Sequence, residues 1–289
     1  MSLTLRYAAH LGYAPPVFRP QFQATVGTGK LASHIEFAAD QGFAGIFDPW
    51  VMERSATDQS EIRNALAETG LSVSSIVCAP TSELTAPLWV DSSAAGRQRI
   101  EQFVRQASSV ATSLGGSLLA ALVAGDEHET DLERQLDNAA ANLNAMGTIA
   151  GDHGLRLGIE PMTVLPNMLT RNLAEAVDLV VRADQADVGI LFDTGHASIT
   201  DGDALRAYET VRKHVVAIQV ADMPGRVEPG AGRLQLVDVV VEAIRGGYDG
   251  VIDLEHQWAE LSREGELAGL QRIREFDEQV AHALRQDGP

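Results

Sequence analysis

The feature that most constrains the fold of this chain is a regular alternation of short apolar segments with longer amphipathic ones. The short segments predict strands at residues 5–8, 44–47, 72–77, 117–121, 156–160, 188–193, 215–221 and 250–255. The longer segments predict helices near residues 31–41, 57–69, 94–114, 131–153, 172–184, 202–213, 236–246 and 262–285. Strands that read as near-continuous apolar runs are typical of a parallel sheet covered on both faces. Eight such strand–helix units close naturally, so we predict an α/β fold, a single (β/α)8 TIM barrel.

The residues between these segments support the barrel. Glycine accepts the left-handed conformation at a helix C-terminus, and four glycines stand where a helix would turn into a strand: Gly42, Gly70, Gly154 and Gly247. Three residues suited to helix N-caps precede helical segments: Asp131, Asn172 and Asp201. With 289 residues and no linker, the chain reads as one barrel domain over residues 1–289. The alternative is a doubly wound open sheet, but the first strand-to-helix loop has no GxGxxG motif.

The charge of the chain limits its partners. Forty acidic residues against 22 basic ones give a net charge of −18, which argues against binding to nucleic acid or to anionic membranes. The sequence shows no signal-peptide pattern and no apolar run of about 20 residues. The only cysteine, Cys78, lies in an apolar run and predicts a buried thiol. We therefore expect a cytoplasmic protein, in which a negatively charged substrate would need a metal ion or an arginine.

Polar residues follow four consecutive late strands, where a barrel places its active site. They are Glu160, Asp193, Gln219 and Glu255. Each could instead cap a helix, pair with an arginine or, for the amide, bond to backbone. Together they should converge, and three carboxylates cannot crowd together ionised without a cation. Oxygen ligands of this kind favour Mg²⁺ or Mn²⁺, so we predict a divalent metal bound by these four residues.

Two further residues lie near these strand ends. His196 follows Asp193 in a predicted loop and could donate a hydrogen bond to a substrate oxygen, or else be a surface or capping histidine. Arg226 lies in the Gly- and Pro-rich segment ADMPGRVEPGAG that follows residues 215–221. Its planar guanidinium suits a substrate carboxylate or hydroxyls, with a salt bridge at the rim as the alternative.

Four pieces of the sequence resemble hydroxypyruvate isomerases and the wider xylose isomerase-like TIM-barrel superfamily: IEPM (159–162), FDTGH (192–196), IQVADMPGRVEPGAG (218–232) and YDGVIDLE (248–255). The resemblance implies that the four residues named above bind the metal and that Glu160 and Glu255 form the acid/base pair. It also implies that His196 and Arg226 contact a sugar or hydroxy-keto acid, and that the protein forms a homodimer or homotetramer.

The chain departs from the family pattern in three places. Thr163 stands where these isomerases usually have asparagine, segment 194–198 reads TGHAS, and FDPWVMERS, with Asp48, Trp50 and Glu53, is particular to this chain. These departures bear on the substrate more than on the chemistry.

The predicted activity is a metal-dependent aldose–ketose or hydroxy-keto-acid isomerisation, in which proton transfer passes through an enediolate. A ketose 3-epimerase, which could use the same two carboxylates, and a lyase or dehydratase acting on a keto-sugar through the same enediolate are alternatives. Related ketose 3-epimerases typically have histidine at the position of Gln219, which disfavours the first alternative. A multi-zinc endonuclease is disfavoured by the acidic charge and because few of the eight histidines stand at strand ends. A non-catalytic sugar-binding barrel is disfavoured because both acid/base positions are retained.

Overall fold

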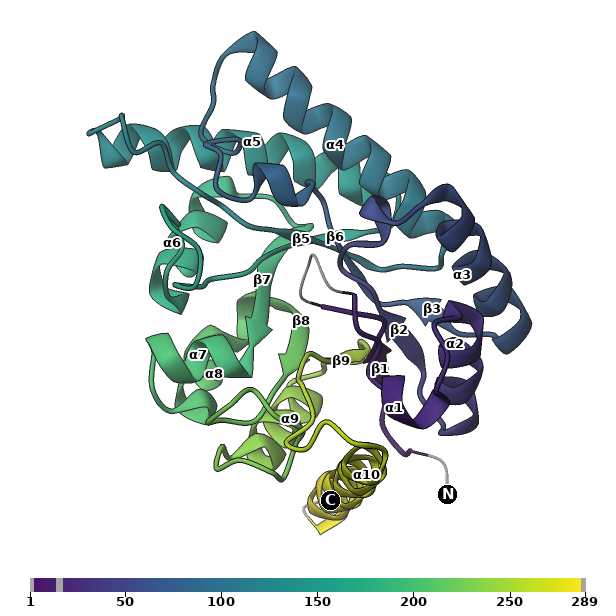
Figure 1. Ribbon diagram of the computed structural model, residues 1–289. Coiled ribbons are helices and arrows are strands. Elements are labelled where there is room, and N and C mark those ends of the chain that lie inside the picture. Colours follow the sequence, from purple (N-terminus) through teal and green to yellow (C-terminus); the bar gives the residue numbers. More distant parts are fainter. Residues whose placement is uncertain (1–2, 14–17, 287–289) are drawn as a thin grey trace.

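A computed structural model describes residues 3–13 and 18–286, in which nine parallel strands curve into a nearly closed barrel with helices around it (Figure 1). The strands are β1 (Tyr7–His10), β2 (Gly45–Phe47), β3 (Ser72–Val73), β4 (Ser75–Val77), β5 (Leu118–Ala121), β6 (Arg156–Ile159), β7 (Val188–Asp193), β8 (Val215–Val220) and β9 (Ile252–Leu254). Their order in the sheet is β3-β2-β1-β9-β8-β7-β6-β5-β4. The (β/α)8 prediction is confirmed, and the doubly wound alternative is wrong because β1 pairs with both β2 and β9.

The ninth strand comes from an interruption of the predicted strand 72–77. Its first part, β3, pairs with β2, and its second part, β4, pairs with β5. Ser74 separates them: its backbone N–H donates to the Ile46 carbonyl at 2.9 Å, while its own carbonyl accepts from Ser117 on the other side at 3.4 Å. One segment therefore bridges the two ends of the sheet, as the third strand of an eight-stranded barrel would.

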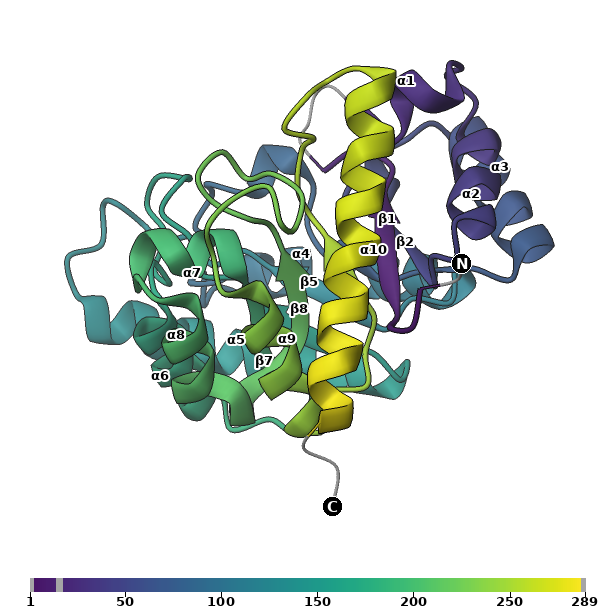
Figure 2. The same cartoon turned by 90° about the horizontal axis from the view of Figure 1, so that it is seen from below.

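The helices follow the predicted segments closely. The α-helices are α1 (Gln23–Val26), α2 (Leu31–Asp40), α3 (Ala56–Thr69), α4 (Ala94–Ser113), α5 (Leu132–Asp152), α6 (Leu173–Ala183), α7 (Thr194–Thr200), α8 (Ala204–Val211), α9 (Leu236–Arg245) and α10 (Arg263–Gln286). Short 3₁₀ turns lie at Val51–Glu53, Thr81–Glu83 and Arg212–His214. The sequence did not predict α1 or α7. In Figure 2, α10 runs along the outside of the barrel, between α9 and the N-terminal elements.

The predicted turns and caps are largely confirmed. The four glycines at helix-to-strand turns all have positive φ, between 71° and 93°. The side chains of Asp131 and Asn172 cap α5 and α6 as expected. The cap predicted at Asp201 is wrong, because that residue ends α7 and Asp203 caps α8 instead.

The first predicted strand is displaced by two residues. The amides of Thr4 and Leu5 donate to the Asp277 carboxylate of α10 at 2.7 and 2.9 Å, so this segment does not join the sheet. The strand continues instead through Ala9 and His10, which are paired with β2.

Apolar side chains form two clusters, one on each side of the strands. Along β5, Leu119 and Ala121 belong to the large cluster shared with the helices, whereas Leu118 and Ala120 belong to a smaller one. Since side chains alternate across a strand, the smaller cluster fills the barrel interior. Cys78 is a free buried thiol, as predicted. Among the helices described, none combines the length and apolarity that crossing a bilayer requires.

Candidate functional site

The four predicted metal ligands share the inward-facing positions of their strands. On β8, Ala217 lies in the interior cluster and Ile218 in the outer one, so Gln219 points inward. The same alternation turns Asp193, Glu160 and Glu255 inward at the carboxyl ends of β7, β6 and β9. The barrel therefore directs all four side chains toward its axis, at the end where barrel active sites lie.

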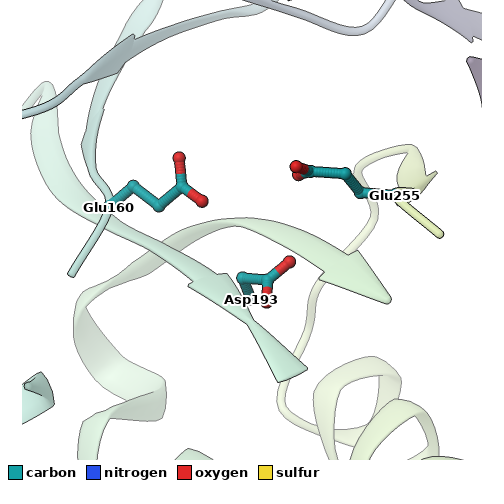
Figure 3. A group of neighbouring side chains, drawn as sticks. All are labelled: Glu160, Asp193 and Glu255. Carbon is teal, nitrogen blue, oxygen red and sulfur yellow. The ribbon is translucent and has the colours of Figure 1, made fainter. Parts of the chain in front are cut away.

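The three carboxylates converge, as the sequence predicted (Figure 3). Glu160, Asp193 and Glu255 each offer one oxygen, and these three atoms lie within 4.8 Å of one another. All three carboxylates are buried or nearly so. Ionised carboxylates this close repel one another unless protons or a cation neutralise their charge. An arrangement of this size and ligand type fits a hard divalent ion.

Gln219 completes the set. It is paired with Asp193 across the β7–β8 ladder, and it lines the same cavity as Glu160 and Glu255. Its Oε1 atom is buried and accepts no hydrogen bond from the residues the structure describes. A buried carbonyl oxygen without a partner is costly, and a metal ion in front of it would remove that cost. The unpaired oxygen is thus an observation, independent of the carboxylates, that fits a metal at this place.

Arg226 supplies the positive charge nearest to the carboxylates. Its Nη1 and Nη2 atoms donate to the two carboxylate oxygens of Asp193 at 3.1 and 2.9 Å, and Nη2 also lies 2.9 Å from Glu255 Oε1. A Cβ on Gly195 would stand 2.8 Å from Nη1, so the glycine leaves room for this contact. The predicted salt-bridge alternative is therefore present, but it lies inside the site and not at its rim.

The loop that carries Arg226 is held by Asp222, which lies two residues after the end of β8. Asp222 accepts hydrogen bonds from the amides of Met223, Gly230, Gly232 and Leu234, at 2.8 to 3.1 Å. The Asp222 carboxylate therefore fixes the loop and is not one of the candidate metal ligands. Arg226 itself adopts a left-handed φ of 52°, which is unusual for a residue with a side chain.

The pKa values of the acids reflect burial against these neighbours. Burial raises the pKa of Glu160 well above its ordinary range, and the negative charges of Glu255 and Asp193 raise it further. Burial also raises the pKa of Glu255 to about 8, although Arg226 opposes the increase. For Asp193, burial is outweighed by Arg226 and His196, and its pKa is lowered. Without a second cation, the two glutamates therefore tend to hold protons.

His196 lies in the first turn of α7, so the predicted loop there is wrong. Its amide donates to Asp193 Oδ1 at 2.7 Å, and its Nε2 atom lies 3.6 Å from Glu160 Oε1. Burial lowers the pKa of the imidazole despite the nearby Asp193 charge. A neutral ring beside Glu160 can donate or accept a hydrogen bond at a substrate oxygen.

The cavity also contains residues that the sequence did not single out for the site. Its other wall is apolar and includes Leu122 and Met162, together with Trp50 from the divergent segment FDPWVMERS. Beneath Glu255, Asp253 also points into the barrel, where its Oδ2 atom accepts from Ser75 Oγ at 2.7 Å. The alternation of inward and outward positions could have indicated Asp253, but the apolar residues look like any others in a core.

Comparison with known proteins agrees with the fold and the predicted resemblance. The family described as xylose isomerase-like TIM barrel matches residues 35–276. The chain is 26% identical over 260 residues to a Streptomyces coelicolor protein named "Putative hydroxypyruvate isomerase", covering 86% of this chain and 92% of that protein. It is 27% identical over 128 residues to an uncharacterized protein of Methanocaldococcus jannaschii, a match that covers 42% of this chain and 44% of that relative.

A solved structure shares the fold over most of its length. It is described as an AP endonuclease of family 2 from Brucella melitensis, with a TM-score of 0.74 and 22% identity over 91% of this chain and 96% of that one. Identity at this level indicates a common barrel and says nothing of a common substrate.

Proposed function

This chain belongs to the xylose isomerase-like TIM barrel family, and from that premise we propose that it is a divalent-metal-dependent isomerase or epimerase of a ketose or hydroxy-keto acid. The observation that carries the proposal is the convergence of three carboxylate oxygens within 4.8 Å, beside the unpaired Oε1 atom of Gln219. The Streptomyces coelicolor relative, which aligns over most of both chains, supports an isomerase.

Glu160, Asp193, Gln219 and Glu255 would hold the ion, with Mg²⁺ or Mn²⁺ the best match to oxygen ligands. When bound, a divalent metal polarises a carbonyl and acidifies the neighbouring C–H bond. Glu160 and Glu255, whose pKa values burial raises, would be ionised beside the cation and so able to act as bases.

The chain's own residues would then move the proton. Glu160 and Glu255 approach the common space from opposite sides (Figure 3), so a substrate between them presents one face to each. One glutamate removes the proton next to the carbonyl, giving an enediolate, and the same or the other glutamate returns a proton. Return to the former carbonyl carbon, with the hydroxyl proton passing to the former carbonyl oxygen, is an isomerisation. Return to the opposite face of the same carbon is an epimerisation.

His196 and Arg226 would orient the substrate. The imidazole lies next to Glu160, where it can hydrogen-bond a hydroxyl on the reacting carbon. The Arg226 guanidinium already bridges Asp193 and Glu255. If a metal ion bound these two carboxylates, the N–H groups of Arg226 would be available to donate to a substrate oxygen. The proposal extends to a single domain over residues 1–289, a cytoplasmic location and a homodimer or homotetramer.

Solvent-exchange analysis tests this function. The Mn²⁺-loaded protein is incubated in deuterium oxide with a panel of ketoses and hydroxy-keto acids, and products are followed by NMR and mass spectrometry. We expect deuterium at the carbon next to the carbonyl and products isomeric with the substrate. Loss of water from the product would instead identify a dehydratase, and the absence of exchange from every compound would overturn the proposal.

A further inference from the structure

The cavity in front of the carboxylates has two chemically different walls. Its volume is about 340 Å³. Glu160, Gln219, Glu255 and His196, from the β6–β9 side, form one wall. The facing wall comes from β4 and from the segments after β2, β4, β5 and β6, and it contributes six apolar side chains: Trp50, Val77, Leu84, Leu122, Met162 and Leu165.

Three polar groups close to the apolar wall already have partners, and the Tyr13 side chain, which also lines the cavity, lies next to Arg226 on the charged side. The indole N–H of Trp50 donates to the Tyr13 carbonyl at 3.0 Å. The Ser75 hydroxyl donates to Asp253 at 2.7 Å, and the Pro49 carbonyl accepts from the Val77 amide at 2.8 Å. A substrate hydroxyl placed against Trp50, Leu122 and Met162 would lose its water partners and gain none.

The charges of the cavity-lining residues also favour an uncharged group against the apolar wall. No lysine or arginine occurs among the cavity-lining residues in the described part of the chain, and Arg226 is held on the carboxylate side. A carboxylate or phosphate at the far end of a substrate would therefore meet no cation on the apolar wall. The cavity also falls in the range of about 300–1,000 Å³ typical of sites for drug-sized ligands, which is more space than the smallest hydroxy-keto acids need.

We propose that the substrate carries an uncharged, ring-sized apolar group attached to the hydroxy-ketone that the carboxylate wall receives. This inference rests on the proposed function for the reacting end and adds the nature of the rest of the substrate. Trp50, Leu122 and Met162 bury the apolar group, while Glu160 and Glu255 face the carbon that exchanges its proton. A fully hydroxylated sugar would use only the charged wall.

A matched pair of compounds tests the proposal. Erythrulose is compared with an analogue in which the C4 hydroxymethyl group, the one farther from the carbonyl, is replaced by benzyl. Both compounds then share the same hydroxy-ketone over C1 to C3. With the full chain loaded with Mn²⁺, we expect kcat/KM for deuterium exchange to be at least about tenfold higher for the benzyl analogue. Equal values, or a preference for erythrulose, would overturn the proposal.

Substitution in the apolar wall locates the effect. Leu122→Asn keeps the branched shape and the number of side-chain heavy atoms but replaces two methyl groups with an amide. We expect it to shift the ratio of the two kcat/KM values at least about tenfold toward erythrulose. Leu267→Asn, on the exposed side of α10, should leave the ratio as in the unsubstituted protein. If Leu122→Asn does not fold by circular dichroism, Leu165→Asn, at a half-buried position in the same wall, gives the same test. A wall variant that folds with an unchanged ratio would contradict the assignment.

Binding separates this inference from the proposed function. If neither compound exchanges deuterium, calorimetric titration of both compounds decides the inference by itself, whatever the full panel shows of the proposed chemistry. Binding of the benzyl analogue at least about tenfold tighter than erythrulose, lost in the wall variant, would support the apolar site. Equal affinity, or no binding of either compound, would refute it.

Discussion

The two halves of the barrel mouth are built by the same geometric rule and filled with opposite chemistry. On β6 to β9, the inward positions at the strand ends hold Glu160, Asp193, Gln219 and Glu255. On β4 and β5, the inward positions hold Val77, Leu118 and Ala120, with Leu122 beyond them. The apolar side chains of this half stabilise the fold by burial, at about 25 cal/mol for each Å² removed from water.

The charged half buries carboxylates and an amide oxygen that reduce the stability of the fold, and its own residues offset this loss only in part. Arg226 neutralises Asp193 and part of Glu255, but Gln219 Oε1 has no partner among the described residues and the pKa of Glu160 is raised. Proteins tolerate such features mainly where function needs them. The contrast therefore separates a half that stabilises the fold from a half that a bound cation would complete.

Removing one carboxylate charge should show the largest difference between the halves. Glu255→Gln keeps the shape of the side chain but cannot act as a base, so we expect kcat to fall by about 10³-fold or more, with the fold retained. Met162→Leu, in the apolar half, should lower kcat by less than about tenfold. Steady-state kinetics with circular dichroism checks both variants. A Glu255→Gln enzyme with near-normal kcat would refute the acid/base assignment.

Removing the internal cation should destabilise the charged half. Arg226→Met leaves Asp193 and Glu255 without their partner, and we expect the metal-free protein to lose about 3 kcal/mol of unfolding free energy at neutral pH. Mn²⁺ should recover more stability in this variant than it adds to the unsubstituted protein. Arg105→Met, which removes an exposed ion pair on α4, should cost less than about 0.5 kcal/mol. Urea denaturation with and without Mn²⁺ measures the unfolding free energies. Equal losses of unfolding free energy in the two variants would contradict the prediction.

Making the charged half more like the apolar half should have opposite effects on stability and metal binding. Gln219→Leu removes the unpaired amide oxygen, so the metal-free protein should gain about 1 kcal/mol. The same change removes one of the four proposed ligands, and Mn²⁺ affinity should fall about tenfold or more. Denaturation and calorimetric titration measure the two effects. Unchanged Mn²⁺ affinity would remove Gln219 from the ligand set.

Much of the barrel could be predicted because its signals are local. The strand 188–193 was predicted with its observed bounds, since an apolar run ends at the capping Asp193. The break at Ser74 and the displaced first strand could not be predicted, because they depend on contacts with Ile46, Ser117 and Asp277 that exist only once the barrel closes. The helix α7 is too short for a periodic pattern.

The site residues also separate into those with a local signal in the sequence and those placed by long-range contacts. Strand ends and side-chain alternation are visible in sequence, so the convergence of Glu160, Asp193 and Glu255 could be predicted. The position of Arg226 depends on a loop folded around Asp222, and no local pattern shows that the two are related. Trp50 belongs to the divergent segment, but only the structure places it in the cavity.

The contact between β1 and β9, called the seam below, borders the charged half. It gives the smallest expected effect, a change in the pH dependence of stability. His10 is buried at this seam, its Nε2–H donates to the His256 carbonyl at 2.9 Å, and its Nδ1 atom has no partner among the described residues. Burial, aided by the nearby His256, lowers the pKa of His10 from 6.5 to about 3. The unfolded chain therefore binds a proton here below pH 6.5 while the folded protein does not, so stability present above pH 6.5 is lost as the pH falls toward about 3.

His10→Gln keeps a donor for the carbonyl and removes this titration. The unfolding free energy of the unsubstituted protein should then fall more steeply than that of the variant between about pH 6.5 and pH 4.5, by up to about 1.4 kcal/mol per pH unit. The matched change His128→Gln, at a position whose side chain is 86% exposed, should leave the slope nearly unaltered. Urea denaturation across this range measures both slopes. If the His10→Gln and unsubstituted curves run parallel, burial does not hold His10 neutral in the folded protein, and this prediction is wrong.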